Sequence, residues 1–245
     1  MKMELSGTAV ITGAAAGIGR AVAEILRDAG VDVLAVDRDE RALATLSGMR
    51  THICDLRSAD ERDALVAKAS GTRYLVNSAG AILIKPILEC TVADLRTIFE
   101  LNVDATWDLT SRIGATMPTG GAIVNMSSAA ARLNANTETA IYSASKAAVL
   151  SVTRSFAHAF APGVRVNAVC PGMIDTGMQV EVLEGLARVR DSTPDGVLSG
   201  RLQTLPLGRM ATAQECAGVI AFLLSDAAAY LTGQAISADG GLVML

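Results

Sequence analysis

A tyrosine and a lysine stand four residues apart in a segment, Ala140–Ala159, whose apolar spacing predicts a helix. Residues at positions i and i+4 of a helix lie on the same face, so we expect the ammonium of Lys146 near the phenol of Tyr142. A free tyrosine has a pKa of about 10, and lowering it by roughly two to three units requires about 3–4 kcal/mol of preferential stabilisation of the phenolate. A neighbouring cation acts in this direction. The pair is therefore predicted to perform general acid–base chemistry.

A serine could hold the oxygen that this pair protonates or deprotonates. Ser127 and Ser128 follow an apolar segment, Ala122–Asn125, that predicts a buried strand. The hydroxyl of Ser128 can donate a hydrogen bond to a substrate oxygen and stabilise charge as it develops. Taken alone, a Tyr/Lys pair is more often a surface contact, and two serines after a strand are more often a helix cap. The catalytic interpretation therefore depends on the motifs around them.

A glycine-rich segment at residues 12–19 lies between an expected strand, Thr8–Ile11, and an expected helix, Ile18–Asp28. Glycines there allow backbone N–H groups to approach a pyrophosphate, and the positive N-terminal end of the helix favours the same charge. The spacing is G-x-x-x-G-x-G and differs from the general G-x-G-x-x-G fingerprint, so the turn alone is weak evidence. Its position between a strand and a helix predicts a dinucleotide site.

An acidic residue follows the second expected strand, Val31–Val36. Asp37 stands at the distance where a carboxylate accepts hydrogen bonds from both hydroxyls of the adenosine ribose. The same charge repels a 2′-phosphate, so Asp37 favours NAD over NADP. Arg38 argues in the opposite direction, because a guanidinium could pair with that phosphate. We expect NAD, since the like charge of Asp37 is a direct penalty.

Composition excludes several other classes. The formal net charge of −4 and the absence of a basic cluster argue against a nucleic-acid partner. The scattered cysteines form no CxxC pair and only two histidines are present, so no metal site is expected. The N-terminus lacks the apolar stretch of a signal peptide, and the apolar runs are too short to cross a membrane. We therefore expect a cytoplasmic protein with no membrane partner and with free thiols, at Cys54, Cys90, Cys170 and Cys216.

Strand-like and helical segments alternate along all 245 residues. The expected strands are Thr8–Ile11, Val31–Val36, Arg50–Ile53, Arg73–Val76, Ala122–Asn125, Val164–Val169 and Ala235–Ser237. The expected helices are Ile18–Asp28, Glu40–Leu46, Ser58–Ala69, Thr91–Met117, Ala140–Ala159 and Ala213–Ser225. This alternation predicts an α/β fold, a Rossmann-type doubly wound parallel β-sheet with helices on both faces, in a single domain spanning residues 1–245. Residues 176–205 are the least patterned, so we expect them to form a mobile substrate flap.

Taken in order, the motifs resemble the short-chain dehydrogenase/reductase family in its compact single-domain branch. The resemblance covers nearly the whole chain, with Ser78 standing where the family has an asparagine. It is carried by Gly13, Gly17 and Gly19, by Asp55-Leu56, by Asn77-Ser78-Ala79-Gly80, by Leu101-Asn102-Val103, by Asn125-Met126-Ser127-Ser128, by Tyr142-Ser143-Ala144-Ser145-Lys146, by Pro171-Gly172-Met173-Ile174-Asp175-Thr176 and by Asp239-Gly240-Gly241.

The resemblance implies roles for individual residues. The implied catalytic set is Asn102, Ser128, Tyr142 and Lys146, in which Asn102 anchors a water chain that returns the proton and Lys146 also binds the nicotinamide ribose. The implied cofactor-binding residues are Gly13, Gly17, Ile18, Gly19, Asp37, Asp55, Leu56, Asn77, Ala79, Gly80, Tyr142, Lys146, Pro171, Gly172, Ile174 and Thr176. The resemblance also implies a homotetramer or homodimer, with the expected helices Thr91–Met117 and Ala140–Ala159 at an interface.

The function that these motifs predict is NAD(H)-dependent hydride transfer between a nicotinamide and a secondary alcohol or ketone. One alternative is a 3-oxoacyl-carrier-protein reductase. That activity mostly uses NADPH, so Asp37 and the non-basic Ala16 count against it. A second alternative is a non-catalytic dinucleotide-binding module. Such a protein usually loses the tyrosine or the lysine, and both Tyr142 and Lys146 are present.

The loop between Ser128 and Tyr142 bears on the substrate. It carries four polar side chains, and burying an apolar ligand against them would leave polar groups unpaired. A small polar substrate, such as a polyol, sugar or cyclic diol, is therefore favoured. The alternative is that these side chains face solvent while the flap supplies an apolar lid. The loop residues are Arg132, Asn134, Asn136 and Glu138, and the lid residues are Met178, Val180, Leu183 and Leu186.

Overall fold

Seven strands form one parallel sheet in the computed structural model, which describes residues 4–133 and 136–244. The strands are β1 (Thr8–Thr12), β2 (Asp32–Asp37), β3 (Arg50–Ile53), β4 (Tyr74–Asn77), β5 (Gly121–Met126), β6 (Val164–Pro171) and β7 (Ala235–Ala238). Their order across the sheet is β3-β2-β1-β4-β5-β6-β7. The chain thus winds outward from β1 to one edge and then from β4 to the other, and the crevice at the carboxyl ends of β1 and β4 is the usual ligand position in such sheets.

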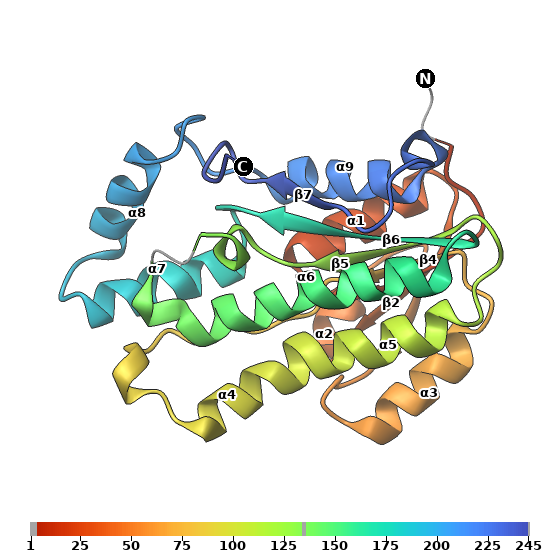
Figure 1. Ribbon diagram of the computed structural model, residues 1–245, viewed down its shortest axis with the longest axis horizontal. Coiled ribbons are helices and arrows are strands. Elements are labelled where there is room, and N and C mark those ends of the chain that lie inside the picture. Colours follow the sequence, from red (N-terminus) through yellow and green to blue (C-terminus); the bar gives the residue numbers. More distant parts are fainter. Residues whose placement is uncertain (1–3, 134–135, 245) are drawn as a thin grey trace.

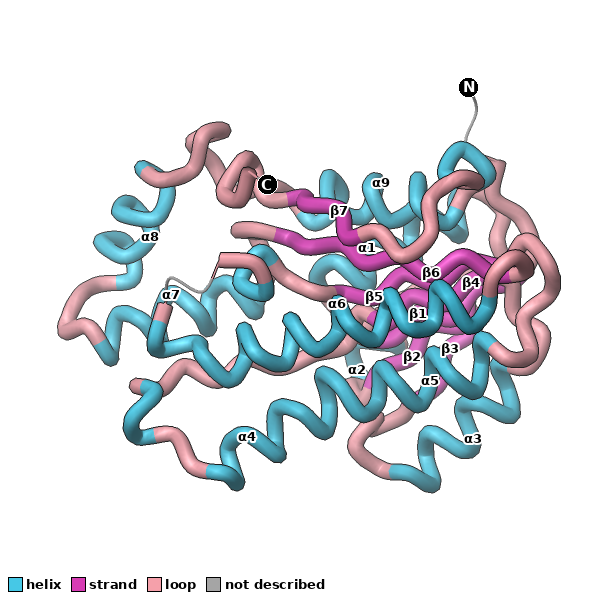
Figure 2. The backbone as a smooth tube through the Cα atoms, viewed as in Figure 1, coloured by secondary structure: helices cyan, strands magenta, loops and turns pink. Residues whose placement is uncertain are grey.

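Helices cover both faces of the sheet, as the alternating pattern predicts (Figures 1 and 2). They are α1 (Gly17–Asp28), α2 (Glu40–Leu43), α3 (Ala59–Ala69), α4 (Val92–Phe99), α5 (Ala105–Gly114), α6 (Ala140–Phe160), α7 (Gly177–Val189), α8 (Pro194–Gln203) and α9 (Ala213–Leu224). The predicted Rossmann-type doubly wound sheet is confirmed. No helix in the described part of the chain is both long and apolar enough to cross a membrane.

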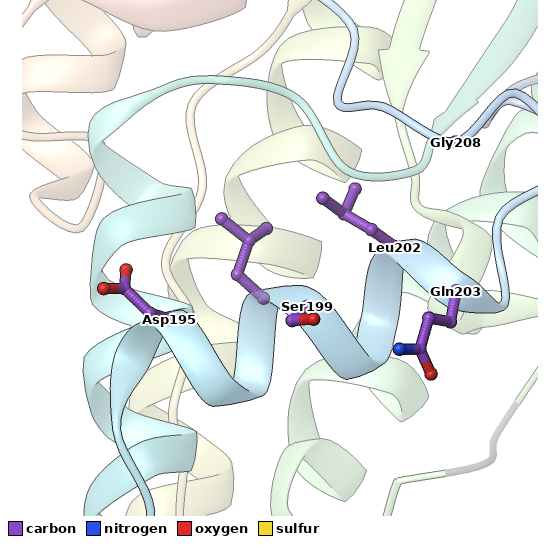
Figure 3. Close-up of a pocket in the computed structure, with 6 residues that line it drawn as sticks. Asp195, Ser199, Leu202, Gln203 and Gly208 are labelled. Atoms are coloured by element: carbon purple, nitrogen blue, oxygen red, sulfur yellow. The ribbon is translucent and has the colours of Figure 1, made fainter.

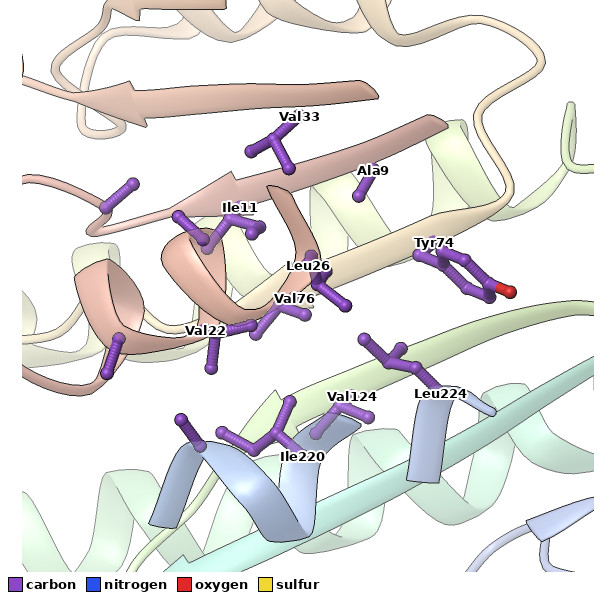
Figure 4. Packing of buried hydrophobic residues seen from close by; sticks show 14 of the residues in the cluster. Ala9, Ile11, Val22, Leu26, Val33, Tyr74, Val76, Val124, Ile220 and Leu224 are labelled. Atoms are coloured by element: carbon purple, nitrogen blue, oxygen red, sulfur yellow. The ribbon is translucent and has the colours of Figure 1, made fainter. Parts of the chain in front are cut away.

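Two apolar cores lie on opposite faces of the sheet because alternate strand residues point to opposite sides. Ile11 and Val76 pack with α1 and α9 in the first core, which Figure 4 shows together with Leu26 of α1 and Ile220 of α9. The second core receives neighbouring strand residues, such as Leu75, and is covered by α3, α5 and α6. Both faces of the five inner strands are therefore largely buried, so the carboxyl ends of these strands are held firmly.

The helix expected over Thr91–Met117 is interrupted by a π-helical turn, Glu100–Asp104, between α4 and α5. The hydroxyl of Thr106, in the first turn of α5, donates to the carbonyl of Asn102 in this turn at 2.9 Å. The helical pattern also ends at Gly114 instead of Met117. Single π turns of this kind occur often at functional sites, and this one contains a predicted site residue.

Residues 176–205, the flap, are helical and not irregular. They form α7 and α8, which lie beyond the carboxyl ends of the strands (Figure 1). Thr193 caps α8 by accepting a hydrogen bond from the N–H of Gly196 at 3.1 Å, and Pro194 occupies the first turn. Val197 is the buried residue of α8, so the helix leaves almost no apolar periodicity in the sequence. The flap packs on the loop after β4 through a small apolar cluster of Ile82, Ile84, Val182, Leu183, Leu186, Ala187 and Val197.

Candidate active site

The glycine-rich turn leads from β1 into α1 and is closely packed. A Cβ at Gly13 would lie 2.8 Å from the backbone of Ala79, and one at Gly19 would lie 2.2 Å from the carbonyl oxygen of Gly13. Neither position therefore accepts a side chain. Ala16 precedes α1 and has no polar side chain to cap it, so first-turn N–H groups of the helix remain available to an anion. The donor set and the tight turn fit a pyrophosphate.

Thr12, which the sequence analysis did not single out, holds this turn against the next crossover. Its hydroxyl oxygen accepts hydrogen bonds from the N–H groups of Ser78 at 3.1 Å and Ala79 at 3.2 Å. The side chain is buried. The only signal in the sequence is its position directly before Gly13. Because Thr12 joins the ends of β1 and β4, it fixes the width of the crevice between them.

Two predicted cofactor segments meet beside α1. A Cβ at Gly17 would lie 3.3 Å from the methyl group of Thr176, and Gly17 has a left-handed φ of 55°. Gly17, Arg20 and Thr176 share a hollow of about 350 Å³ with Asp175 and the start of α9. Residues separated by more than 150 positions in the sequence thus form one wall.

Asp37, at the end of β2, lies over the glycine-rich turn. One carboxylate oxygen accepts a hydrogen bond from the N–H of Ala15 at 3.1 Å, and the other accepts from the N–H of Asp39 at the same distance. Arg38 is exposed beside it. The carboxylate is therefore next to the turn, where the sequence analysis expects the adenosine ribose.

The next predicted cofactor-binding residues are Asp55, Leu56 and Asn77, and they differ in exposure and in hydrogen-bond partners. The carboxylate of Asp55 accepts from the N–H of Arg57 at 3.0 Å and is partly exposed, whereas Leu56 is buried in the second core. Asn77 is also buried, and its amide nitrogen donates to Thr110 at 3.0 Å and to Asn125 at 2.9 Å. The side chain of Asn77 thus points into the protein and joins β4 to β5, which leaves its backbone at the crevice.

Asn102 is fully buried in the π-helical turn, and both ends of its amide are used. The oxygen accepts from the N–H of Ala81 at 2.8 Å. The nitrogen donates to the carbonyl of Ala81 at 2.9 Å and to the hydroxyl of Ser145 at 3.0 Å. Asn102 therefore links the crossover after β4 to the helix that carries Tyr142 and Lys146. Ser145, which lies inside the quoted Tyr-x-x-x-Lys segment, was not assigned a role from sequence.

Lys146 is buried, and its amine lies on the same face of α6 as Tyr142, with the nitrogen 5.8 Å from the centre of the phenol ring. The amine donates to the carbonyl of Met126, at the end of β5, at 2.9 Å. Ser127 donates to the backbone carbonyl of Lys146 at 2.8 Å and holds the helix against the strand. Burial lowers the pKa of Lys146 to about 8, so the amine changes its charge close to neutral pH.

Burial raises the pKa of Tyr142, and a hydrogen bond with the Ser128 hydroxyl offsets part of that increase. The direction is opposite to the expectation from sequence, in which the neighbouring Lys146 lowers the pKa. The reason is desolvation of the phenolate, which is the largest effect on this group. The buried thiol of Cys170 also lies in this group of side chains, and burial raises its pKa too. Ser128, Tyr142 and Lys146 are thus brought together at the ends of β5 and β6.

The segment after β6 completes this edge. A Cβ at Gly172 would lie 2.7 Å from the backbone of Asp239, so the Pro171-Gly172 turn and the C-terminal Asp239-Gly240-Gly241 signature pack directly on each other. Ile174 is buried in the first core, and its carbonyl accepts from the hydroxyl of Thr176 at 3.3 Å. The turn therefore has a fixed course beside the catalytic edge.

The polar side chains of the loop before Tyr142 bind other parts of the chain. Arg132 donates to the hydroxyl of Ser237 at 3.0 Å and to the carbonyl of Ala235, so it reaches β7. Glu138 forms an ion pair with Arg190, at the end of α7, at 2.9 Å. Arg190 also bonds to the amide oxygen of Asn136, while Asn134 lies outside the described residues. The three described side chains therefore have hydrogen-bond partners within the protein. They do not by themselves support the prediction that this loop forms a polar wall of the substrate pocket.

The expected apolar lid is divided. Leu186 and Leu183 belong to the cluster that attaches the flap to Ile84, so they serve the packing of the flap. Met178 and Val180 are exposed. Among the described residues, no group of three or more His, Cys, Asp or Glu side chains is placed to hold a metal ion.

Comparisons with known proteins place this geometry in a family. A family model described as enoyl-(acyl-carrier-protein) reductase matches residues 13–243. Oxidoreductase UcpA of Salmonella typhimurium is 35% identical, over 96% of this chain and 93% of its own. The 2-keto-3-deoxy-L-fuconate dehydrogenase of Xanthomonas campestris is 34% identical over 95% of this chain and 78% of its own. A crystal structure of a short-chain dehydrogenase/reductase (glucose/ribitol dehydrogenase) from Brucella melitensis superposes with a TM-score of 0.89, at 34% identity and over the whole of both chains.

The chain belongs to the short-chain dehydrogenase/reductase family. It is an oxidoreductase for substrates of the alcohol or ketone type, and the family uses a nicotinamide dinucleotide. The glycine-rich turn, the first turn of α1 and Asp37 together fit such a group in their packing and in their hydrogen-bonding groups.

Proposed function

We propose that the protein is an NAD-dependent dehydrogenase/reductase that transfers a hydride between the nicotinamide and a secondary alcohol or ketone of a small polar substrate. The observation that supports this most directly is the grouping of Ser128, Tyr142 and Lys146 at the carboxyl edge of the sheet, where Ser128 lies close enough to the phenol to lower its pKa. This arrangement offers one position for a substrate oxygen, within reach of two hydroxyl groups.

The chain's residues perform the proton chemistry, and the nicotinamide, when bound, supplies or accepts the hydride. Tyr142 donates a proton to the carbonyl oxygen in reduction and receives it from the alcohol in oxidation. Ser128 donates a hydrogen bond to the same oxygen. Protonated Lys146 stabilises the phenolate and holds the nicotinamide ribose, and Asn102, through Ser145, supports the path by which the proton returns. Since burial raises the pKa of Tyr142, we assign the opposing effect to the positive charge of Lys146.

Asp37 is the residue that favours NAD as the cofactor in this proposal. Its carboxylate lies over the glycine-rich turn, within hydrogen-bond distance of the N–H of Ala15. A ribose with two free hydroxyls can pair with this carboxylate, whereas a 2′-phosphate meets a like charge. Asp37→Ala is expected to weaken the preference for NAD. Tighter binding of NADPH than NADH by the wild type would contradict this assignment.

We also propose that the protein is a homodimer or homotetramer. Val92, Leu95 and Trp107 leave 65%, 41% and 51% of their surface exposed along α4 and α5. Trp107 packs edge-on against the buried ring of Phe156 of α6, which holds the exposed indole beside that helix. A light-scattering mass of one chain, 25.3 kDa, at micromolar concentration would contradict the assembly.

The activity is tested by following the absorbance of NADH with purified protein against a panel of alcohols and ketones. We expect turnover of polyols, sugars or cyclic diols with higher kcat/KM than hydrophobic ketones. Tyr142→Phe should bind NADH as the wild type does and lose about 10²–10⁴-fold in kcat, since only the acid–base hydroxyl is removed. Substantial turnover by Tyr142→Phe would refute the role of Tyr142, and preference for the hydrophobic ketones would refute the polar substrate.

A further inference from the structure

The flap contains two buried N–H groups that have no hydrogen-bond partner among the described residues. They are Nε2 of Gln179, on α7, and Nη1 of Arg201, on α8. Gln179 is 8% exposed, and Nη1 of Arg201 is itself buried although the residue as a whole is partly exposed. Buried polar groups in proteins are nearly always paired, so two unpaired donors in one small element point to a partner from outside the chain.

Gln179 lies on the inner face of α7. It stands three residues before Val182, and residues at this spacing share a face of the helix. Val182 packs in the cluster that attaches the flap to Ile82 and Ile84. Moving from Val182 to Gln179 leads away from the tip of the flap and toward Thr176, after β6. Gln179 is therefore buried in the first turn of α7, at the end of the flap that follows directly on β6.

Arg201 has the corresponding position on α8. It follows Val197 by four residues, and Val197 belongs to the same apolar cluster. From there the chain leads to Leu205, whose side chain would lie 3.4 Å from a Cβ at Gly240, after β7, so the end of α8 that carries Arg201 adjoins the carboxyl edge of the sheet. The opposite face of α8 borders a separate hollow of about 410 Å³ (Figure 3), lined by Asp195, Leu198, Ser199, Leu202, Gln203 and Gly208.

The positive charge of Arg201 is not neutralised by an acidic side chain among the described residues. The carboxylate of Glu138 bonds through both oxygens to Arg190, at 2.9 and 3.2 Å. Burial and the nearby positive charge of Arg190 both lower the pKa of Arg201, and no acidic group among the described residues counters them. A guanidinium nitrogen that is buried without a counter-ion is unfavourable, and a carboxylate is the partner whose planar geometry the guanidinium matches best.

We propose that Arg201 and Gln179 form a subsite for a carboxylate of the substrate, so that the enzyme acts on a hydroxy acid or the corresponding oxo acid. Glu138 is four residues before Tyr142, and its bond to Arg190 ties the flap to the catalytic helix. The acid group of a short substrate can thus bind the flap while its hydroxyl or carbonyl oxygen meets Ser128. The reaction itself rests on the function proposed above, whereas binding of the carboxylate does not.

Binding is tested first, on the full chain with and without NADH. The probes are propionate, butyrate and succinate, with propionamide, butyramide and inorganic phosphate as comparisons, and the measurements are the melting temperature and calorimetric titration. We expect the carboxylates to bind and the amides and phosphate not to. Arg201→Gln should lose this binding, whereas Arg188→Gln, which removes an exposed arginine of the same flap, and Tyr142→Phe should keep it.

Turnover is then compared for pairs of C3–C6 hydroxy acids and their methyl esters. We expect the wild type to favour the acids by roughly 30-fold in kcat/KM, which is the size of a charge-assisted hydrogen bond. Arg201→Gln should remove that advantage through KM and leave kcat/KM for the esters within about threefold, Gln179→Met should remove part of it, and Arg188→Gln should leave it unchanged. Arg201→Lys should restore part of it because the charge is kept. If Arg201→Gln does not fold, as judged by circular dichroism, Gln179→Met and Arg201→Lys carry the same comparison.

The outcomes separate the two proposals. Carboxylate binding that survives in Arg201→Gln, preference for phosphate, or equal loss on acids and esters overturns the subsite. Turnover of neutral substrates alone, with no carboxylate binding, also overturns the subsite and leaves the dehydrogenase intact. Arg201-dependent binding of carboxylates without turnover of any panel member supports the subsite and overturns the proposed function.

Discussion

The carboxyl edge of the sheet and the flap differ in how completely their buried polar side chains are hydrogen-bonded. At the edge, the amides of Asn102 and Asn125 are fully buried, and both ends of each amide have partners from other elements. In the flap, Gln179 and Arg201 bury donors that have no partner among the described residues. Asn102 and Asn125 are thus paired within the chain itself, although Oδ1 of the neighbouring Asn77 has no partner among the described residues. In the flap, we propose that the substrate supplies the missing partner.

The two regions also differ in the amount of apolar packing that holds them. The strands that end at the carboxyl edge contribute to two large cores, whereas the flap is attached by one small cluster around Leu186 and Ile84. Local stability follows the amount of buried apolar contact, so the flap is expected to open at lower free energy than the sheet. Under the proposed function, the more firmly packed edge positions the proton-transfer groups and the flap contacts the rest of the substrate. Four measurements test this contrast.

The largest difference between two variants is expected from matched glycine substitutions. Gly19→Ala places a Cβ 2.2 Å from the carbonyl oxygen of Gly13, which should cost about 3 kcal/mol or more and abolish NADH binding. Gly200→Ala, inside α8, meets no described atom within 4 Å and should stabilise the protein by about 0.5–1 kcal/mol. Urea unfolding and NADH titration measure both. Similar free energies of unfolding for the two variants would remove the contrast.

The second test compares one buried amide from each region. Asn102→Ala leaves the N–H and the carbonyl of Ala81 without partners, at about 1–3 kcal/mol each, so we expect a loss of about 4 kcal/mol. Gln179→Met keeps the shape of a side chain whose Nε2 is unpaired and should change stability by less than about 1 kcal/mol. Equal losses in urea unfolding would show that Gln179 is paired in solution.

Lys146 gives a prediction that depends on pH. Its pKa is about 8 in the folded protein and about 10.4 when unfolded. Between these values the unfolded chain binds a proton that the folded protein lacks, so the stability of the wild type rises with pH. Relative to Lys146→Met, the wild type should therefore gain about 3 kcal/mol between pH 7 and pH 10.5. Unfolding in urea across this range measures the difference, and a constant difference would mean that Lys146 is not desolvated.

The smallest effect is expected at the ion pair that joins the flap to the catalytic helix. Arg190 is partly exposed, so a double-mutant cycle with Glu138→Gln and Arg190→Gln should give a coupling of about 0.5 kcal/mol at pH 7. Arg190 lowers the pKa of Glu138, so the coupling is present above the carboxyl's unfolded pKa and is lost as the pH falls through the lower folded pKa. Thermal melts of the four proteins at pH 7 and pH 3 measure it. A coupling above about 2 kcal/mol would show that the flap is held as firmly as the sheet.

Local spacing in the sequence predicted the parts of the protein whose structure depends on near neighbours. The strands, the glycine-rich turn before α1 and the shared face of Tyr142 and Lys146 follow from the periods of strand and helix and from the conformational freedom of glycine. The sequence left the flap open between helical and irregular structure, and α8 in particular has a single buried residue, Val197, and so shows little apolar periodicity.

Tertiary structure alone decided which distant groups become partners. The amide of Asn77 points inward to Asn125, Arg132 reaches β7, and the amine of Lys146 bonds to the carbonyl of Met126. These choices depend on which segments pack together, and no short spacing records them. The direction of the Tyr142 pKa shift depends on tertiary packing as well. The sequence predicts that a lysine lies near the phenol, but only the folded protein shows that burial disfavours the charged phenolate and raises the pKa.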